Sequence, residues 1–149
     1  KSETDRYGEY SLSGEYTFDR PFLWGSKRTG PDLHRVGNYR TTDWHEVHMW
    51  EPSAVVDGSI MPTYKHQFTN KADIETAYAE AVTVKNAFHT PYGDEFIGTR
   101  EAWNAYRPTV IAQAKTIADD MQNEDVKKAV ANGEVPEVVA LIAYLNSLK

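Results

Sequence analysis

The chain has 149 residues, a formal net charge of −6, 40% hydrophobic residues and 26% charged residues, which indicates one folded domain rather than a disordered chain. Its 22 acidic residues outnumber 16 basic ones, which argues against nucleic acid as a partner because a nucleic-acid-binding surface is basic. No apolar run approaches the ~18 residues that cross a membrane. The absence of cysteine excludes disulfides, zinc–thiolate sites and thioether-linked cofactors within these residues.

The N-terminal third of the chain predicts little regular structure. Residues 7–24 (YGEYSLSGEYTFDRPFLW) are rich in aromatic side chains, but Gly8, Gly14 and Pro21 interrupt any helical period. We expect an irregular segment there, with one short hairpin at most, and a turn-rich stretch over residues 25–40.

Hydrophobic periodicity predicts helices along the rest of the chain. The first begins at Thr41 or Thr42, whose hydroxyls can cap it, and stops before Pro52. A second is expected from residues 69 or 70 to about residue 89. A third is expected from about residue 99 to residue 122, with Pro108 either kinking it or marking its true first turn.

The C-terminal part predicts a short helical piece and one further helix. The piece covers residues 126–131 and ends at Asn132–Gly133, a pair typical of a helix C-terminus. The last helix has Pro136 near its first turn and an apolar stripe from Val138 to Leu148. The predicted fold class is therefore all-α with a long irregular N-terminal third.

No common enzyme motif is present. The chain has no phosphate-binding glycine loop, no G-x-S-x-G, no H-E-x-x-H and no C-x-x-C. The remaining ordered set consists of Gly30-Pro31-Asp32-Leu33, Trp44, Trp50-Glu51-Pro52, Ile60-Met61-Pro62 and a terminal LIAYLNSL helix.

This order resembles the body of a class I cytochrome c after its haem-attachment motif. More closely, the stretches RYGEYSLSGEYTFDRPFLWGSKRTGPDLHRVG and DWHEVHMWEP…SIMPTY resemble the mono-haem subunit (subunit II) of cbb3-type cytochrome c oxidases. The resemblance implies a single periplasmic cytochrome c-like domain over residues 1–149. Residues 1–64 and 134–149 would be its cytochrome c-like parts, and about 65–133 a helical insertion before the C-terminal helix.

The resemblance also implies roles for six residues around haem c in the intact protein. Met61 would be the axial sulfur ligand of the haem iron, since a neutral thioether suits ferrous iron. The Pro31 carbonyl would orient the proximal histidine, and Leu33 would contact the haem edge. Trp44, Arg35 and Arg40 would meet the haem propionates.

One departure from the family pattern concerns haem attachment. The family's C-x-x-C-H motif and its N-terminal membrane anchor are expected before Lys1, so we expect this chain to be a fragment that binds no haem by itself. Losing a helix and a haem would leave an apolar hollow, which is costly. We expect the fragment to compensate by collapsing its Met61 loop, by exchanging segments or by forming a dimer.

The function implied by the resemblance is electron transfer in aerobic respiration, at the periplasmic face of the bacterial inner membrane. A di-haem subunit or a soluble cytochrome c would donate the electron, and the catalytic subunit would accept it. Oxygen reduction would occur in that other subunit, so this chain would have no active site of its own.

Two other functions stay open. His45 and His48, spaced i, i+3 on the first predicted helix, could bind a divalent metal ion. The middle helices, about residues 70–131, could instead serve as a structural module that docks a partner. Met61, Trp44 and the arginines also have ordinary structural explanations, as a loop residue, a helix face and solvated charges.

Overall fold

The computed structural model describes residues 2–12, 14–15, 30–33 and 36–148. The helices within them are α1 (Ser2–Tyr7), α2 (Thr42–Trp50), α3 (Ile74–Phe88), α4 (Asp94–Ile97), α5 (Arg100–Asp119), α6 (Glu124–Ala131) and α7 (Glu137–Ser147). Short 3-10 helices lie at η1 (Val36–Asn38), η2 (Pro52–Ala54) and η3 (Lys65–Phe68). No strand occurs in the described ranges, only an isolated bridge between Lys71 and Pro136. The predicted all-α class is confirmed.

Helix α2 follows the sequence prediction closely. The Thr41 hydroxyl accepts a hydrogen bond from the backbone N–H of Trp44 at 3.4 Å, which caps the helix. The helix ends at Trp50, and Pro52 then opens η2.

Helix α3 begins later than residue 69 or 70, so that predicted start is wrong. Residues 70–72 instead pair with the segment that leads into α7: Ala72 N–H donates to the Val135 carbonyl at 2.7 Å, and Glu137 N–H donates to the Asn70 carbonyl at 3.0 Å. The Asp73 carboxylate then caps α3. Residues that the local pattern assigned to the helix therefore form backbone hydrogen bonds with a segment far away in the sequence.

Helix α5 runs through Pro108, so that proline does not mark its first turn. The helix also ends at Asp119 rather than at Gln122. A contact with a distant helix accounts for this earlier end. The Glu46 carboxylate of α2 accepts hydrogen bonds from the backbone N–H groups of Gln122 and Asn123 at 2.7 and 2.8 Å. These contacts satisfy amides that would otherwise continue the helix.

The C-terminal helices are confirmed. The Asn123 side chain caps α6, which begins at Glu124, two residues before its predicted start, and Gly133 has the positive φ of 81° expected after a helix end. Pro136 immediately precedes α7. In the N-terminal third, the predicted hairpin falls largely on residues outside the described ranges. Helices α1 and α4 were not predicted.

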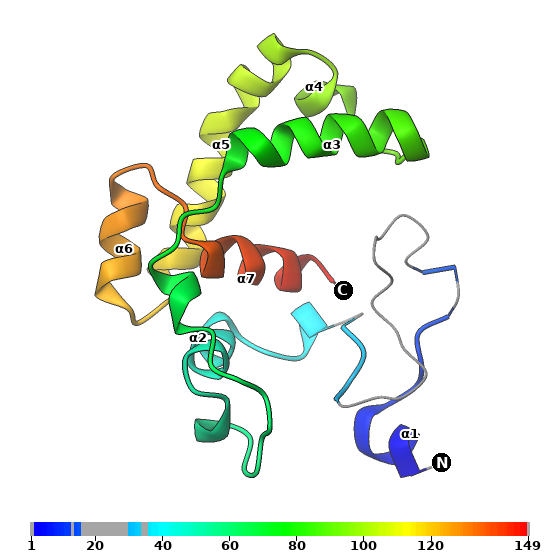
Figure 1. The fold of residues 1–149 in the computed structure, drawn as a ribbon, viewed down its shortest axis with the longest axis vertical. Coiled ribbons are helices and arrows are strands. Elements are labelled where there is room, and N and C mark those ends of the chain that lie inside the picture. The colour runs from blue at the N-terminus through cyan, green and yellow to red at the C-terminus, as the bar shows by residue number, and fades with distance from the viewer. Residues whose placement is uncertain (1, 13, 16–29, 34–35, 149) are drawn as a thin grey trace.

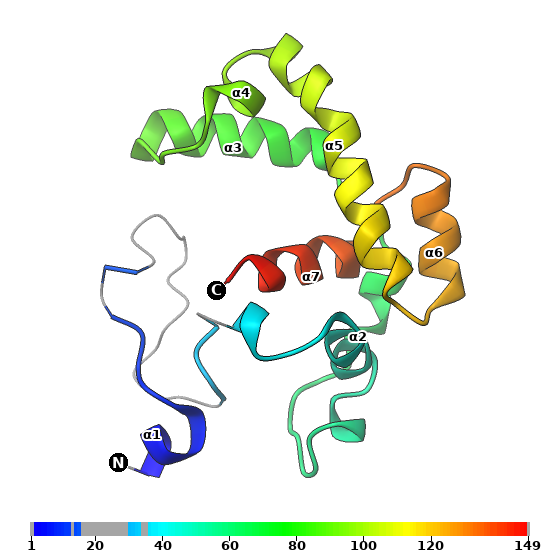
Figure 2. The same cartoon turned by 180° about the vertical axis from the view of Figure 1, so that it is seen from behind.

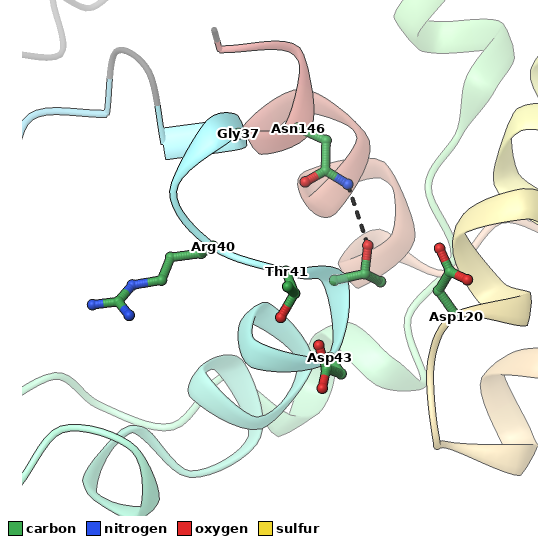
Figure 3. Close-up of a pocket in the computed structure, with 7 residues that line it drawn as sticks. Gly37, Arg40, Thr41, Asp43, Asp120 and Asn146 are labelled. Atoms are coloured by element: carbon green, nitrogen blue, oxygen red, sulfur yellow. Dashed lines mark hydrogen bonds between the residues drawn. The ribbon is translucent and has the colours of Figure 1, made fainter.

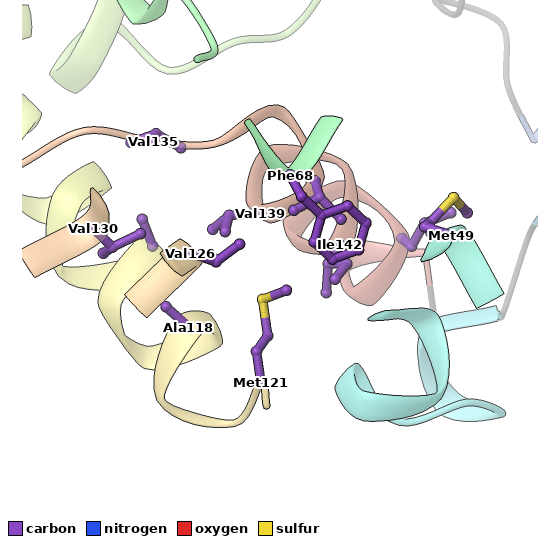
Figure 4. Packing of buried hydrophobic residues seen from close by; sticks show 12 residues of the cluster. Met49, Phe68, Ala118, Met121, Val126, Val130, Val135, Val139 and Ile142 are labelled. Atoms are coloured by element: carbon purple, nitrogen blue, oxygen red, sulfur yellow. The ribbon is translucent and has the colours of Figure 1, made fainter. Parts of the chain in front are cut away.

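The hydrophobic core lies where α5, α6 and α7 meet α2 and η3 (Figure 4). Met121, Val126, Val138, Val139 and Ile142 are fully buried. The buried cluster consists of Met49, Phe68, Ala114, Ala118, Met121, Val126, Val130, Val135, Val138, Val139, Ile142 and Leu145. Side chains from the predicted insertion thus share one core with α7.

A helical arm projects from this core. Helices α3 and α4 and the first part of α5, which we call the arm (residues 74–107), lie at the end of the molecule opposite α1 (Figures 1 and 2). Within it the Trp103 ring stacks on Tyr78 with centroids 5.1 Å apart, and the indole N–H donates to Glu75 at 3.3 Å. Arg100 also contacts the Glu75 carboxylate at 2.6 Å. The arm therefore has a small aromatic and ionic core of its own.

Helix α2 is held beside the C-terminal helix. The Asn146 amide donates to the Thr42 hydroxyl at 3.4 Å, and Gly37 N–H donates to the Leu148 carbonyl at 2.9 Å. A Cβ at Gly37 would lie 2.6 Å from the Asn146 carbonyl oxygen, so only glycine allows η1 and α7 to approach this closely. In the described part of the chain, no helix has the length and apolar character needed to span a bilayer.

Candidate functional site

One face of α2 and the loop before it carry a stack of planar groups. The Arg40 guanidinium lies over the Trp44 ring at 4.5 Å and over the Tyr39 ring at 4.4 Å. On α2 the Trp44 ring stacks on His48, with centroids 4.5 Å apart and an interplanar angle of 22°. The structure therefore brings together Arg40 and Trp44, two residues that the sequence analysis assigned to the site.

Two imidazoles of α2 have nitrogen atoms without partners. His45 is 2% exposed and meets Trp44 edge to face at 5.4 Å. Both the His45 Nε2 and the His48 Nδ1 are buried, and among the described residues neither atom has a hydrogen-bond partner. Such atoms are uncommon in folded proteins and call for an explanation.

The surroundings favour neutral imidazoles. Burial lowers the pKa of His45, and the positive charges of His48 and Arg40 lower it further. Burial also lowers the pKa of His48, again with Arg40 adding to the effect. A neutral imidazole has one N–H donor and one acceptor nitrogen.

Met61 lies in a loop that returns to the end of α2. The Tyr64 N–H donates to the Met49 carbonyl at 2.8 Å, and the Met61 N–H donates to the Ser59 hydroxyl at 3.3 Å. Met61 is half-buried and packs against the hydrophobic core, whereas the neighbouring Ile60 is 93% exposed. The thioether is thus at the margin of the core, not inside it.

The Gly-Pro turn contributes one core contact. Leu33 is half-buried and packs against the same hydrophobic cluster as Met61. Pro31 is exposed, and its proposed role toward a histidine stays a prediction. Arg35 lies outside the described residues.

An open polar pocket of about 530 Å³ lies between the start of α2 and the end of α7 (Figure 3). The sequence analysis did not single out this pocket, because its residues come from three separate segments. Arg40 points away from Asp43 and Asp120 in this view. The pocket is lined by Gly37, Arg40, Thr41, Thr42, Asp43, Asp120 and Asn146.

The residues that the sequence analysis assigned to the site, most of which do not line this pocket, have side chains of the kinds that contact a haem group. Met61 offers a soft sulfur and Leu33 offers an apolar contact. Arg40 offers a cation that stacks on aromatic rings and, among the described residues, pairs with no acid. The unpartnered nitrogens of His45 and His48 offer hydrogen-bonding capacity that the described protein atoms leave unused. Among the described residues, no group of three or more His, Cys, Asp or Glu side chains could hold a metal ion.

Comparison with known proteins identifies the family. A search of curated proteins found no match. A family model described as "Cytochrome C oxidase, mono-heme subunit/FixO" matches residues 1–149, the full length of the sequence. The chain therefore belongs to the family of mono-haem subunits of cytochrome c oxidase.

Proposed function

We propose that this chain is the electron-transfer domain of a cbb3-type haem–copper oxidase. It would receive electrons from a di-haem subunit or a soluble cytochrome c, and pass them to the catalytic subunit. The observation that carries the proposal is the match to the mono-haem subunit family over residues 1–149. The domain would face the bacterial periplasm and bear an anchor outside these residues.

The proposal gives Met61 the central role. Haem, when bound, supplies a one-electron iron couple. Met61 would present its sulfur to the iron, and the bond between Tyr64 N–H and the Met49 carbonyl would hold the loop in place. Because residues 1–149 contain no cysteine, the proposal requires a C-x-x-C-H segment elsewhere in the polypeptide to attach the haem and provide the second ligand.

The other predicted residues would shape and neutralise the pocket. Leu33 would exclude water from the haem edge, and the Pro31 carbonyl would accept the N–H of the proximal imidazole. Arg40, Trp44 and Arg35 would meet the propionates. The stacking of Arg40 on Trp44 supports this assignment, because it places the guanidinium next to the indole ring.

The three methionines allow a matched test in the full-length, haem-loaded subunit. Met61→Leu should lose the low-spin spectrum or its high midpoint potential, since leucine cannot ligate iron. Met49 is 9% exposed and Met121 is 0% exposed, so Met49→Leu and Met121→Leu change only how these side chains fill the hydrophobic core and serve as controls. An unchanged spectrum and potential in Met61→Leu would refute the ligand assignment. A colourless full-length subunit would refute the function.

A second candidate function is docking of another oxidase subunit by the arm. Helix α3 spans 15 residues and none of its side chains is buried, so apolar residues such as Val82 and Val84 remain partly exposed in the described part of the chain. Ala79→Arg and Ala87→Arg, at exposed α3 positions, should then weaken assembly of the complex on native gels. Ala112→Arg at an exposed α5 position is the control, and equal assembly of all three variants would exclude this surface.

Metal binding by His45 and His48 has less support. The described residues supply no third ligand, and Arg40 places a positive charge near both imidazoles.

A further inference from the structure

The loop before Met61 is built from successive backbone hydrogen bonds that end at Ser59. Val56 N–H donates to the Pro52 carbonyl at 3.0 Å, which ties the loop to η2, and Ser59 N–H donates to the Val56 carbonyl at 3.1 Å. Gly58 lies between them with a φ of 68°, a left-handed conformation that glycine adopts without strain at the third position of such a turn. The turn therefore fixes the backbone of Ser59 relative to η2.

Ser59 is the residue of this loop that turns inward. Residues 53–58 and Ile60 are all exposed, whereas Ser59 is half-buried. Its hydroxyl accepts a hydrogen bond from the Met61 N–H at 3.3 Å, the kind of side-chain-to-backbone bond by which serine fixes a turn. Ile60, between the two, is 93% exposed, so its side chain adds little packing that would hold the loop. The Ser59 hydroxyl thus holds the Met61 backbone on its N-terminal side.

The C-terminal side of Met61 is held differently. Pro62 follows with its φ fixed by the ring and no N–H to donate. Tyr64 N–H then donates to the carbonyl of Met49, a residue that is 9% exposed in the hydrophobic core. Met61 therefore lies between a backbone anchor on α2 and an anchor that one hydroxyl supplies. A single substitution can remove only the second, and it does so without altering a core residue.

We propose that Ser59 is a positioning residue for the Met61 sulfur, and that its bond to the Met61 N–H keeps the sulfur in place for the haem iron. The inference rests on the proposed function, since it needs haem bound to this domain. A neutral thioether favours ferrous iron, so its hold on ferric iron depends more on how the protein positions it. Contacts behind a metal ligand commonly supply that positioning.

The test uses the full-length, haem-loaded subunit in its ferric form, with imidazole as the probe. Imidazole binds the iron only after the Met61 sulfur has left, so its affinity reports how firmly the sulfur is held. Ser59→Ala should raise that affinity about twofold to tenfold, the range expected for the loss of one neutral hydrogen bond. Hydrogen exchange at the Met61 amide should become faster by a similar factor, because the acceptor of that amide is gone.

Matched variants distinguish hydrogen bonding from packing. Threonine and valine have nearly the same shape, but only threonine carries a hydroxyl. Ser59→Thr should therefore keep the wild-type imidazole affinity and exchange rate, whereas Ser59→Val should behave like Ser59→Ala. Ser53→Ala is the control on the same loop, because the exposed Ser53 hydroxyl donates to the Glu51 carboxylate at 2.7 Å. It should leave both measurements unchanged.

The outcomes separate this inference from the proposed function. A colourless wild-type subunit would overturn the function, and the inference with it. A normal haem spectrum with wild-type imidazole affinity in Ser59→Ala and Ser59→Val would overturn the inference alone, even if exchange at Met61 became faster, because Ser59 would then hold the loop but not the sulfur. Equal increases in affinity in Ser59→Thr and Ser59→Val would also overturn it, since packing would then be the cause.

Discussion

The Glu46 carboxylate accepts a hydrogen bond from the backbone N–H of Asn123 at 2.8 Å, across 77 residues of sequence. Asn123 itself caps α6 through its side chain. The contact therefore joins the helix that carries Trp44 and the two histidines to the connection between α5 and α6. Glu46 is 6% exposed, so this bond is largely shielded from water. The position of the candidate site depends on it.

Glu46→Gln should destabilise the chain by about 1–3 kcal/mol, because the amide NH₂ would face a backbone N–H that has lost its acceptor. Denaturant unfolding measures the effect. Glu80→Gln, an exposed change on α3, serves as the control and should shift stability by less than about 0.5 kcal/mol. Equal stability of the two variants would show that the Glu46 contact contributes nothing.

Gly37→Ala should cost about 1–3 kcal/mol, the usual range for overpacking. The new Cβ would meet backbone atoms of Asn146 at 2.6 and 2.8 Å, and backbone cannot move aside as a flexible side chain can. Gly30→Ala is the matched control, because a Cβ there meets nothing within 4 Å. Thermal unfolding should show a lower Tm for Gly37→Ala only. A wild-type Tm in both variants would argue against close packing of η1 on α7.

Stability should fall as the pH drops below the ordinary histidine pKa of about 6.5. Burial and nearby positive charge lower the folded-state pKa of His45 and His48, so the unfolded chain binds more protons in this window. The stabilisation is thus complete above 6.5 and is lost toward the lower folded values. Denaturant unfolding at several pH values should show a shallower slope in His48→Leu. His66→Leu should retain the wild-type slope, and an unchanged slope in His48→Leu would contradict the assignment.

Trp103→Ala should loosen the arm while leaving the main core folded. Trp103 is 6% exposed and stacks on Tyr78, and truncating a buried tryptophan typically costs about 3–5 kcal/mol. Hydrogen exchange should rise in α3 and α4 but not in α6 or α7.

Trp103→Phe is the milder companion of that variant. It keeps an aromatic ring, the smaller phenyl group, but removes the indole N–H donor, which is the largest cause of the lowered Glu75 pKa. The pKa of Glu75, measured by NMR, should rise toward its usual value. Uniformly raised exchange in Trp103→Ala would instead show that arm and core unfold together.

Local chemistry accounts for the elements that the sequence predicted well. Thr41, Thr99 and Asn123 cap their helices with their own side chains, and Gly133 ends α6, so neighbouring residues suffice to set these boundaries. The boundaries that failed depend on distant partners. Backbone pairing with Val135 delays the start of α3, and hydrogen bonds to the Glu46 carboxylate accompany the early end of α5.

In the candidate site, too, the sequence identified some residues, but their contacts became visible only in the structure. The sequence identified Met61, Leu33, Trp44 and Arg40 through a resemblance carried by residue types and their order. It could not show that Arg40 stacks on Trp44, or that His45 and His48 keep buried nitrogens without partners. Those facts depend on side-chain packing between α2 and the segments around it.

The sequence by itself determined the helical class, the boundaries of α2 and α7 and the family, because capping residues, periodic apolar positions and ordered motifs act over short range. Only the tertiary structure decided that the middle helices share a core with α7 and that residues 74–107 project from it as an arm. The burial of the α2 histidines beside Arg40 was decided there too. The physical reason is that burial and satisfied hydrogen bonds depend on atoms far apart in the chain, such as Glu46 and Asn123.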